Sequence, residues 1–108
     1  GRGSVCINSA GEKIYPEEVE EVIKSIDGIR DALVVGVPDD KWGNAVIAVI
    51  EGDEKPADEL KRLIKLHLAS YKVPKKFLFK DTLGRAPNGK ADYKTITAYA
   101  KNILGIAG

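Results

Sequence analysis

The chain of 108 residues contains one cysteine, one histidine and no methionine. A single cysteine cannot form an internal disulfide, and one cysteine with one histidine is too small a set for a zinc site. We therefore expect no structural metal and a reducing compartment, the cytoplasm. Because there is no methionine at position 1, we expect the chain to be a piece of a longer protein.

The sequence also lacks an excess of charge of either sign. It has 17 Lys and Arg against 16 Asp and Glu, for a formal net charge of +1. Nucleic-acid binding usually requires a concentrated basic surface, and the small cluster of Lys72, Lys75 and Lys76 is explained equally well as a solvated face. We expect no nucleic-acid partner. The apolar runs are too short to cross a membrane, and no signal peptide is recognisable.

Apolar residues recur at helical and at strand spacing in alternating segments, which predicts several short elements of both kinds. The segment that opens at Pro16 has acidic residues in its first turn and then an apolar stripe, both typical of a helix start. The expected elements are hairpin strands at 5–7 and 13–14, a helix from 16 to 27, strands within 29–37 and 45–50, a helix from 56 to about 69, a strand at 77–80 and a helix at 93–104.

This order predicts an α+β fold, a small three-layer-like sandwich with a short N-terminal β-hairpin and a three-stranded sheet packed with about three helices. The two long apolar strands should pair antiparallel with both faces covered. The second helix places His67 on its apolar side, where a structural role is expected. The last helix carries an apolar stripe of Ile96, Ala100, Ile103 and Leu104.

The loop at residues 84–94 carries the strongest functional signal. A turn at residues 87–89 leaves Lys90 at its tip, where the cation can reach an anion on another surface. The spacing matches the G-x-x-x-x-G-K phosphate-binding loop, but Ala91 stands where that motif needs a hydroxyl for Mg²⁺, and Pro87 removes a backbone donor. We reject that motif. A solvated lysine on a connecting loop is the alternative.

Four segments, in the expected order, resemble the C-terminal domain of the adenylate-forming enzymes, the superfamily that includes the acyl-CoA synthetases. These segments are GEKIYPEEVE (11–20), VVGVPDDKWG (34–43), YKVPK (71–75) and RAPNGK (85–90). The details look most like the bacterial fatty-acyl-CoA synthetases. The resemblance implies a junction and start of a hairpin at 1–10, a mobile lid domain at 11–104 and a tail at 105–108. Its partner would be the large N-terminal adenylation domain of the same protein.

The resemblance implies an ATP-dependent ligase that converts a fatty acid, ATP and CoA into acyl-CoA, AMP and pyrophosphate. The lid would deliver a lysine for adenylation and then turn to present part of the CoA tunnel. ATP, CoA and Mg²⁺ would be bound by the intact enzyme and none by this domain alone, so the isolated chain should be inactive. Acid specificity would belong to the large domain.

By the same resemblance, Lys90 is the catalytic lysine and a target for a lysine acetyltransferase. Arg2 would lie near the nucleotide, and Ser4 stands at the hinge, where Asp or Lys is more usual. The residues expected on the CoA side are Gly11, Glu12, Trp42, Tyr71 and Lys72. Trp42 is equally well explained as an aromatic that caps the sheet edge. The alternative is that the chain is a free-standing module without catalytic activity, which binds a small ligand or has a regulatory role.

Overall fold

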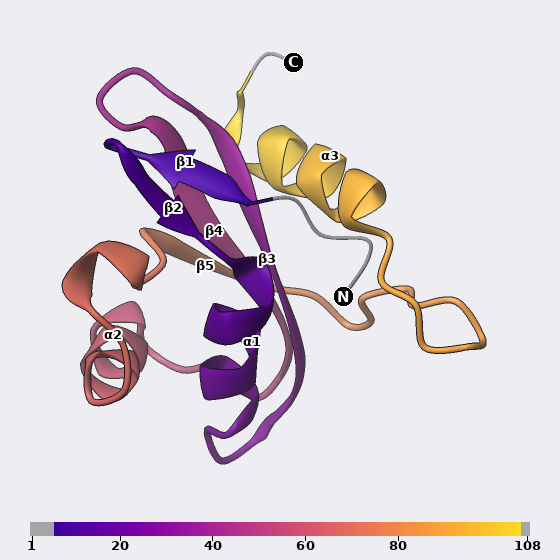
Figure 1. The fold of residues 1–108 in the computed structure, drawn as a ribbon. Helices are drawn as coiled ribbons and strands as arrows, with labels where there is room; N and C mark the ends of the chain where they lie inside the picture. The colour runs from indigo at the N-terminus through magenta and orange to yellow at the C-terminus, as the bar shows by residue number, and fades with distance from the viewer. Residues whose placement is uncertain (1–5, 107–108) are drawn as a thin grey trace.

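The computed structural model describes residues 6–106, which form a two-stranded hairpin, a three-stranded sheet and three α-helices (Figure 1). In the three-stranded sheet the order is β3-β4-β5, with β3 and β4 antiparallel and β4 and β5 parallel. The elements are β1 (Ile7–Ser9), β2 (Glu12–Ile14), α1 (Pro16–Lys24), β3 (Ile29–Asp39), β4 (Gly43–Gly52), α2 (Ala57–Lys65), a 3₁₀ turn (Ser70–Lys72), β5 (Lys76–Phe79) and α3 (Tyr93–Leu104).

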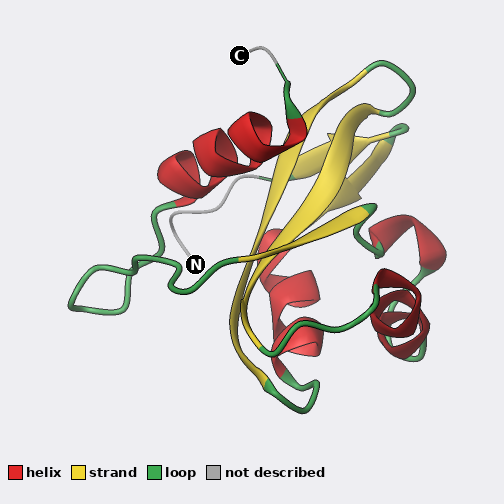
Figure 2. Cartoon of the chain, turned by 180° about the vertical axis from the view of Figure 1, so that it is seen from behind, coloured by secondary structure: helices red, strands yellow, loops and turns green. Residues whose placement is uncertain are grey.

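The central strand β4 is apolar on both faces because helices cover both. Its successive side chains alternate between two cores, as the pleat requires. Val46, Ala48 and Ile50 pack on the side of α1 and α2, and Ala45, Ile47 and Val49 pack on the side of α3. Figures 1 and 2 show α3 on one face of the sheet and α1 with α2 on the other. This confirms the predicted three-layer α+β sandwich.

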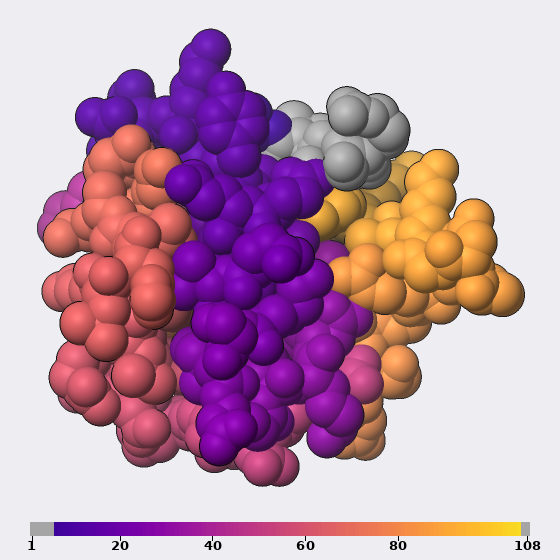
Figure 3. Space-filling model, turned by 60° about the horizontal axis from the view of Figure 1, so that its bottom comes forward, coloured from indigo at the N-terminus to yellow at the C-terminus, as the bar shows by residue number. Residues whose placement is uncertain are grey.

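The core beneath α1 and α2 is built on fully buried branched side chains. Ile23 of α1 and Ile64 of α2 are both 0% exposed. Burying such a side chain completely stabilises the fold by about 1.5–3 kcal/mol relative to leaving it in water. Figure 3 shows the outer surfaces of α1 and of the α2 region side by side, with residues of the loop before α3 protruding at the opposite edge.

Several element boundaries differ from the prediction. Helix α1 ends at Lys24 and not at 27, β3 and β4 are longer than expected, and β5 is Lys76–Phe79 and not 77–80. For two further boundaries the structure gives the reason. Strand β1 starts at Ile7, and both Ile7 and Ser9 are buried, so the inward-facing serine concealed the strand from a hydrophobicity pattern. Helix α2 ends at Lys65, because the backbone tightens there: the N–H of Leu66 donates to Leu63 O at 3.2 Å.

Two side-chain placements were also wrong. His67 lies beyond the end of α2 and is exposed, so it does not contribute to the apolar side of that helix. Ile103 of α3 is 53% exposed, while Ile96 and Ala100 are buried as expected. The described helices are all too short or too polar to cross a membrane.

Candidate functional site

The loop that carries Lys90 is anchored before it leaves the sheet. After β5 ends at Phe79, the side chain of Leu83 is buried among the residues on the α3 side. The N–H of Leu83 donates to Glu51 Oε1 at 3.1 Å. The chain then runs over the surface to Tyr93, the first residue of α3. The loop is therefore a bridge between two fixed points.

The tip of the loop is a closed turn. Ala86 N donates to Lys90 O at 3.0 Å and Gly89 N donates to Ala86 O at 2.7 Å. Gly89 has a φ of +83°, which a residue without a Cβ adopts at little energetic cost. Lys90 N donates to Asn88 Oδ1 at 3.0 Å. The turn predicted at 87–89 is confirmed.

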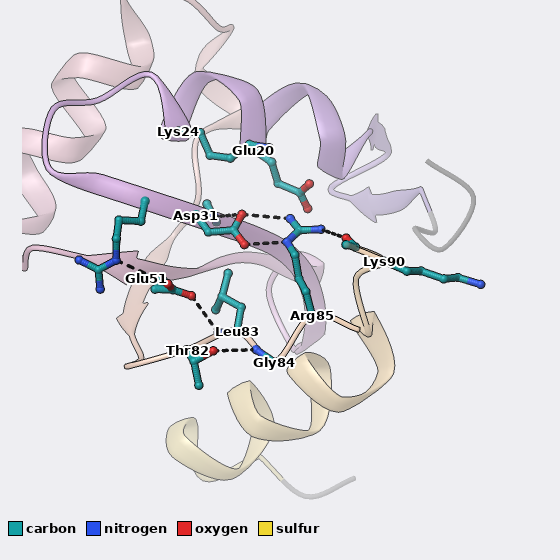
Figure 4. Close-up of polar contacts among 12 residues, drawn as sticks. Glu20, Lys24, Asp31, Glu51, Thr82, Leu83, Gly84, Arg85 and Lys90 are labelled. Carbon is teal, nitrogen blue, oxygen red and sulfur yellow. Dashed lines mark hydrogen bonds and ion pairs between the residues drawn. The ribbon is translucent and has the colours of Figure 1, made fainter. Parts of the chain in front are cut away.

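The Lys90 side chain is exposed and extends away from the protein (Figure 4). Within residues 6–106, its ammonium group forms no ion pair and no hydrogen bond. Among the described residues, this loop therefore presents a hydrogen-bonded turn with an unengaged cation at its end. Such a group is available to an anion on another surface.

An ion pair that the sequence analysis missed holds this loop against the sheet. Arg85 donates from Nε to Asp31 Oδ2 at 2.6 Å and from Nη2 to Asp31 Oδ1 at 3.0 Å, a bidentate arrangement. Burial alone would raise the pKa of the Asp31 carboxyl, but the hydrogen bonds from Arg85 and from Ala32 N–H, with the Arg85 charge, hold it below its ordinary value. The aspartate is therefore ionised at neutral pH.

A second missed contact lies beside the ion pair. Glu20 of α1 is only 4% exposed. It accepts a hydrogen bond from Val34 N at 2.9 Å and from the Tyr93 hydroxyl at 2.8 Å. Burial raises the pKa of Glu20, partly offset by these two donors. Burial and the Glu20 carboxylate also raise the pKa of Tyr93. The only signal in the sequence was that Glu20 lies three residues before Ile23, on the apolar side of α1.

The residues expected on the CoA side lie at another part of the molecule. The hairpin turn places Ala10 at φ +52° and Gly11 at φ +83°, the positive φ values that a tight two-residue hairpin needs. Ala10 N donates to Trp42 O at 2.8 Å, so the turn contacts the β3–β4 loop. Glu12 is exposed at the start of β2. The local backbone by itself accounts for glycine at position 11.

Trp42 is contacted by two lysines. The Lys75 ammonium lies 4.3 Å from the centroid of the indole ring and that of Lys41 lies 5.0 Å from it, distances typical of cation–π contacts. Tyr71 is 41% exposed. Lys72 pairs with Glu18 of α1, with 2.8 Å between Nζ and Oε1. The structure therefore brings Ala10, the neighbour of Gly11, to the backbone of Trp42, and Lys75, three residues after Lys72, to the Trp42 ring.

In Figures 1 and 2 the Lys90 loop and the hairpin turn lie on opposite sides of the molecule. Arg2 and Ser4 fall outside the described residues. Within residues 6–106, no group of three or more His, Cys, Asp or Glu side chains is placed to hold a metal ion. The chain thus offers two separate polar faces, one around Lys90 and one around Trp42.

Comparison with known proteins identifies the kind of domain. Residues 18–90 match the family model described as the AMP-binding enzyme C-terminal domain. The chain belongs to this family. A 3-oxocholest-4-en-26-oate–CoA ligase of Rhodococcus rhodochrous is 47% identical over 109 aligned residues, covering 98% of this chain and 19% of that protein. A medium/long-chain-fatty-acid–CoA/3-oxocholest-4-en-26-oate–CoA ligase of Mycobacterium tuberculosis is 48% identical over 97 residues, covering 87% and 18%.

A solved structure agrees with the sequence relatives. The Mycobacterium tuberculosis fatty acyl CoA synthetase has a TM-score of 0.85 and 33% sequence identity, covering 91% of this chain and 20% of that one. The chain therefore spans about a fifth of the length of the relatives that it matches. Both the fold and the family expected from the four sequence segments are confirmed.

Proposed function

We propose that this AMP-binding enzyme C-terminal domain is the mobile lid of an ATP-dependent acyl-CoA ligase and that Lys90 is its adenylation lysine. The observation that supports this most directly is the unengaged Lys90 ammonium on a loop that is fixed at both ends. The names of the relatives indicate the acid class: a fatty acid or a steroid with a carboxylated side chain.

The chemistry suits such a cation. When a carboxylate attacks the α-phosphate of ATP, two negative groups approach each other and charge develops on the phosphate oxygens. A preorganised ammonium stabilises that charge more in the transition state than in the ground state. The large N-terminal domain would hold ATP and the acid, while this domain supplies Lys90. The residues at 6–106 offer no carboxylate cluster for Mg²⁺, so we assign that ion to the rest of the enzyme.

For the second step, we propose that the domain presents its other polar face to CoA, with Gly11, Glu12, Trp42, Tyr71 and Lys72. The Lys72 ammonium is held by Glu18, so a CoA phosphate would have to compete with that carboxylate. Arg2 near the nucleotide and Ser4 at the hinge complete the proposed assignments. Acetylation of Lys90 by a lysine acetyltransferase would remove its charge and leave one amide N–H in place of three ammonium donors, and the exposure of this side chain supports access.

Half-reaction kinetics on the full-length enzyme test the assignment of Lys90. Lys90→Ala should slow adenylate formation by roughly a hundred- to a thousandfold, the usual effect of losing one preorganised electrostatic contact. Thioester formation from supplied acyl-adenylate should stay near the wild-type rate, because it uses the other face. Lys94→Ala is the matched control, and its adenylation rate should fall less than about tenfold, since a surface lysine away from the reacting groups contributes little.

If the Lys90→Ala enzyme formed the adenylate at the wild-type rate, the assignment would be overturned. Lys90 would then be a solvated lysine on a turn. The alternative function, a free-standing ligand-binding or regulatory module, makes a different prediction for the isolated chain. A module should gain thermal stability on adding ATP, CoA or acyl-AMP at concentrations above the dissociation constant. An isolated lid should show no pyrophosphate exchange and little or no shift in melting temperature.

A further inference from the structure

Strand β3 is an edge strand, and two carboxylates cover its free side. The sheet order β3-β4-β5 leaves one side of β3 without a partner strand, and unpaired N–H groups on such an edge need other acceptors. Ala32 N donates to Asp31 Oδ1 at 2.9 Å, and Val34 N donates to Glu20 Oε2 at 2.9 Å. Asp31 and Glu20 are therefore fixed by the backbone of the sheet.

The same two carboxylates hold the chain on either side of Lys90. Asp31 accepts the bidentate contact from Arg85, five residues before Lys90. Glu20 accepts the hydroxyl of Tyr93, three residues after Lys90. In Figure 4 the Arg85 guanidinium lies between Asp31 and the loop, with the Glu20 carboxylate nearby.

Arg85 also contacts the peptide group that carries Lys90. Its Nη1 donates to Gly89 O at 3.0 Å, and that carbonyl belongs to the peptide bond that ends at Lys90 N. One guanidinium therefore links the rigid sheet, through Asp31, to the backbone at the base of the Lys90 side chain. The pair is partly shielded from water, with side-chain exposures of 29% for Arg85 and 18% for Asp31.

Other restraints on this loop are few. Residues 86–90 are all exposed, so no apolar packing fixes the turn against the sheet. The hydrogen bonds within the turn set its shape but not its direction relative to β3. Without Arg85, the nearest points at which side chains pack on the core are Leu83 before the turn and Ala91 after it, and the intact turn could pivot between them. Lys90 would then have to be ordered at each catalytic cycle, and a displacement of about 1 Å is enough to slow a reaction a hundredfold.

We infer that Arg85, held by Asp31, is a positioning residue for Lys90 in adenylate formation. This inference rests on the proposed function of Lys90. Arg85 touches no substrate in this assignment, and it acts only by fixing where the Lys90 ammonium lies when the lid closes.

The test is a double-mutant cycle in the full-length enzyme, with both half-reactions and thermal melts measured. Arg85→Ala and Asp31→Asn should each lower the adenylation kcat by about ten- to a hundredfold, the effect of a misplaced group. The KM for ATP and thioester formation from supplied acyl-adenylate should change less than about threefold. Arg85→Lys should recover part of the adenylation rate, because it keeps one contact to Asp31 but loses the planar fork.

The decisive measurement is Arg85→Ala in the Lys90→Ala background. If Arg85 acts through Lys90, the second substitution should cause almost no further loss, because groups that act as one unit are not additive. Arg62→Ala is the matched control. Arg62 is exposed on α2, which lies on the other face of the sheet from α3. Its adenylation rate should stay within about twofold of wild type, as for a surface substitution away from the Lys90 loop.

The outcomes separate the two ideas. Suppose that Lys90→Ala loses adenylation while Arg85→Ala and Asp31→Asn keep the wild-type adenylation rate. The positioning role of Arg85 is then wrong, and the proposed function of Lys90 stands. Further loss from Arg85→Ala in the Lys90→Ala background, or equal loss in both half-reactions, would also overturn it and leave a purely structural ion pair. If Lys90→Ala adenylates normally, the proposed function itself fails. Should Arg85→Ala not fold, Asp31→Asn and Arg85→Lys carry the same comparison.

Discussion

Replacing Tyr93 by phenylalanine removes one hydroxyl from the contact that fixes the start of α3 to α1. The hydroxyl oxygen lies 2.8 Å and 3.0 Å from the two Glu20 oxygens, and Glu20 is 4% exposed. After the change, this buried carboxylate keeps only the donor from Val34 N among the described contacts. A hydrogen bond to a charged group contributes about 1.5–3 kcal/mol, so Tyr93→Phe should lower the free energy of unfolding at pH 8 by roughly that amount.

The dependence on pH makes the prediction specific. The pKa of Glu20 in the folded chain lies above its ordinary value of 4.5. Between those two values the folded chain binds more protons than the unfolded chain, so this group makes the protein more stable as the pH falls through that window. Loss of the Tyr93 donor should raise the Glu20 pKa further. The difference between variant and wild type should therefore shrink to about 0.5–1.5 kcal/mol in acid, the value of a neutral hydrogen bond.

Urea unfolding of the 108-residue chain at pH 8 and at a pH below 4.5, where the Glu20 carboxyl is protonated in the folded chain, measures both numbers. Tyr99→Phe is the matched control, since Tyr99 lies on the same helix and no hydrogen bond of its hydroxyl is present within residues 6–106. Phenylalanine at position 99 keeps the ring that packs against the core and contacts Lys80, so this variant should change stability by less than about 0.5 kcal/mol. Equal and small losses in the free energy of unfolding for Tyr93→Phe and Tyr99→Phe would refute the argument. So would a Tyr93→Phe difference that grows as the pH falls.

Three further predictions follow from the contacts described above. The pKa of Asp31 lies below its ordinary value of 3.8. The ionised Asp31 carboxylate therefore stabilises the fold, and this stabilisation is lost as the pH falls through the folded-state pKa. In acid titrations, Asp31→Asn should therefore lose less stability below about pH 4 than wild type does. Gly11→Asn adds a side chain but tolerates positive φ, so a full-length enzyme with this change should form thioester more slowly while adenylating normally. Ile64→Ala should destabilise the chain by about 2–5 kcal/mol in urea unfolding, while Ile103→Ala, at an exposed position, should change it by less than about 0.5 kcal/mol.

Local patterns were sufficient for the elements whose signal is local. The last helix begins at Tyr93 and ends at Leu104 as predicted, and the two apolar runs became the antiparallel strands β3 and β4. The first hairpin strand was predicted too early in the chain, at 5–7 in place of Ile7–Ser9, because the inward-facing Ser9 breaks the alternation of apolar and polar residues. Periodicity alone also placed His67 on a helix that had already ended.

The contacts around Lys90 were beyond such reasoning because they join distant segments. Arg85 and Asp31 are 54 residues apart, and Tyr93 and Glu20 are 73 apart. In the sequence, Glu20 is one of several glutamates in the first turns of a helix, a placement that the helix dipole explains without any partner. Only the fold reveals that its side chain turns inward onto the free edge of β3.

The sequence signal at Lys90 and the structural signal around it have different origins. The GK pair after a turn identifies which residue carries the charge, but a turn on the surface leaves the direction of that charge open. Direction is fixed by the edge strand, whose unpaired N–H groups hold Asp31 and Glu20 in place. Those carboxylates in turn hold Arg85 and Tyr93. An exposed lysine on an unrestrained loop would have to be ordered before it could stabilise a transition state, so the catalytic role proposed for Lys90 depends on the part-buried contacts at the base of the loop.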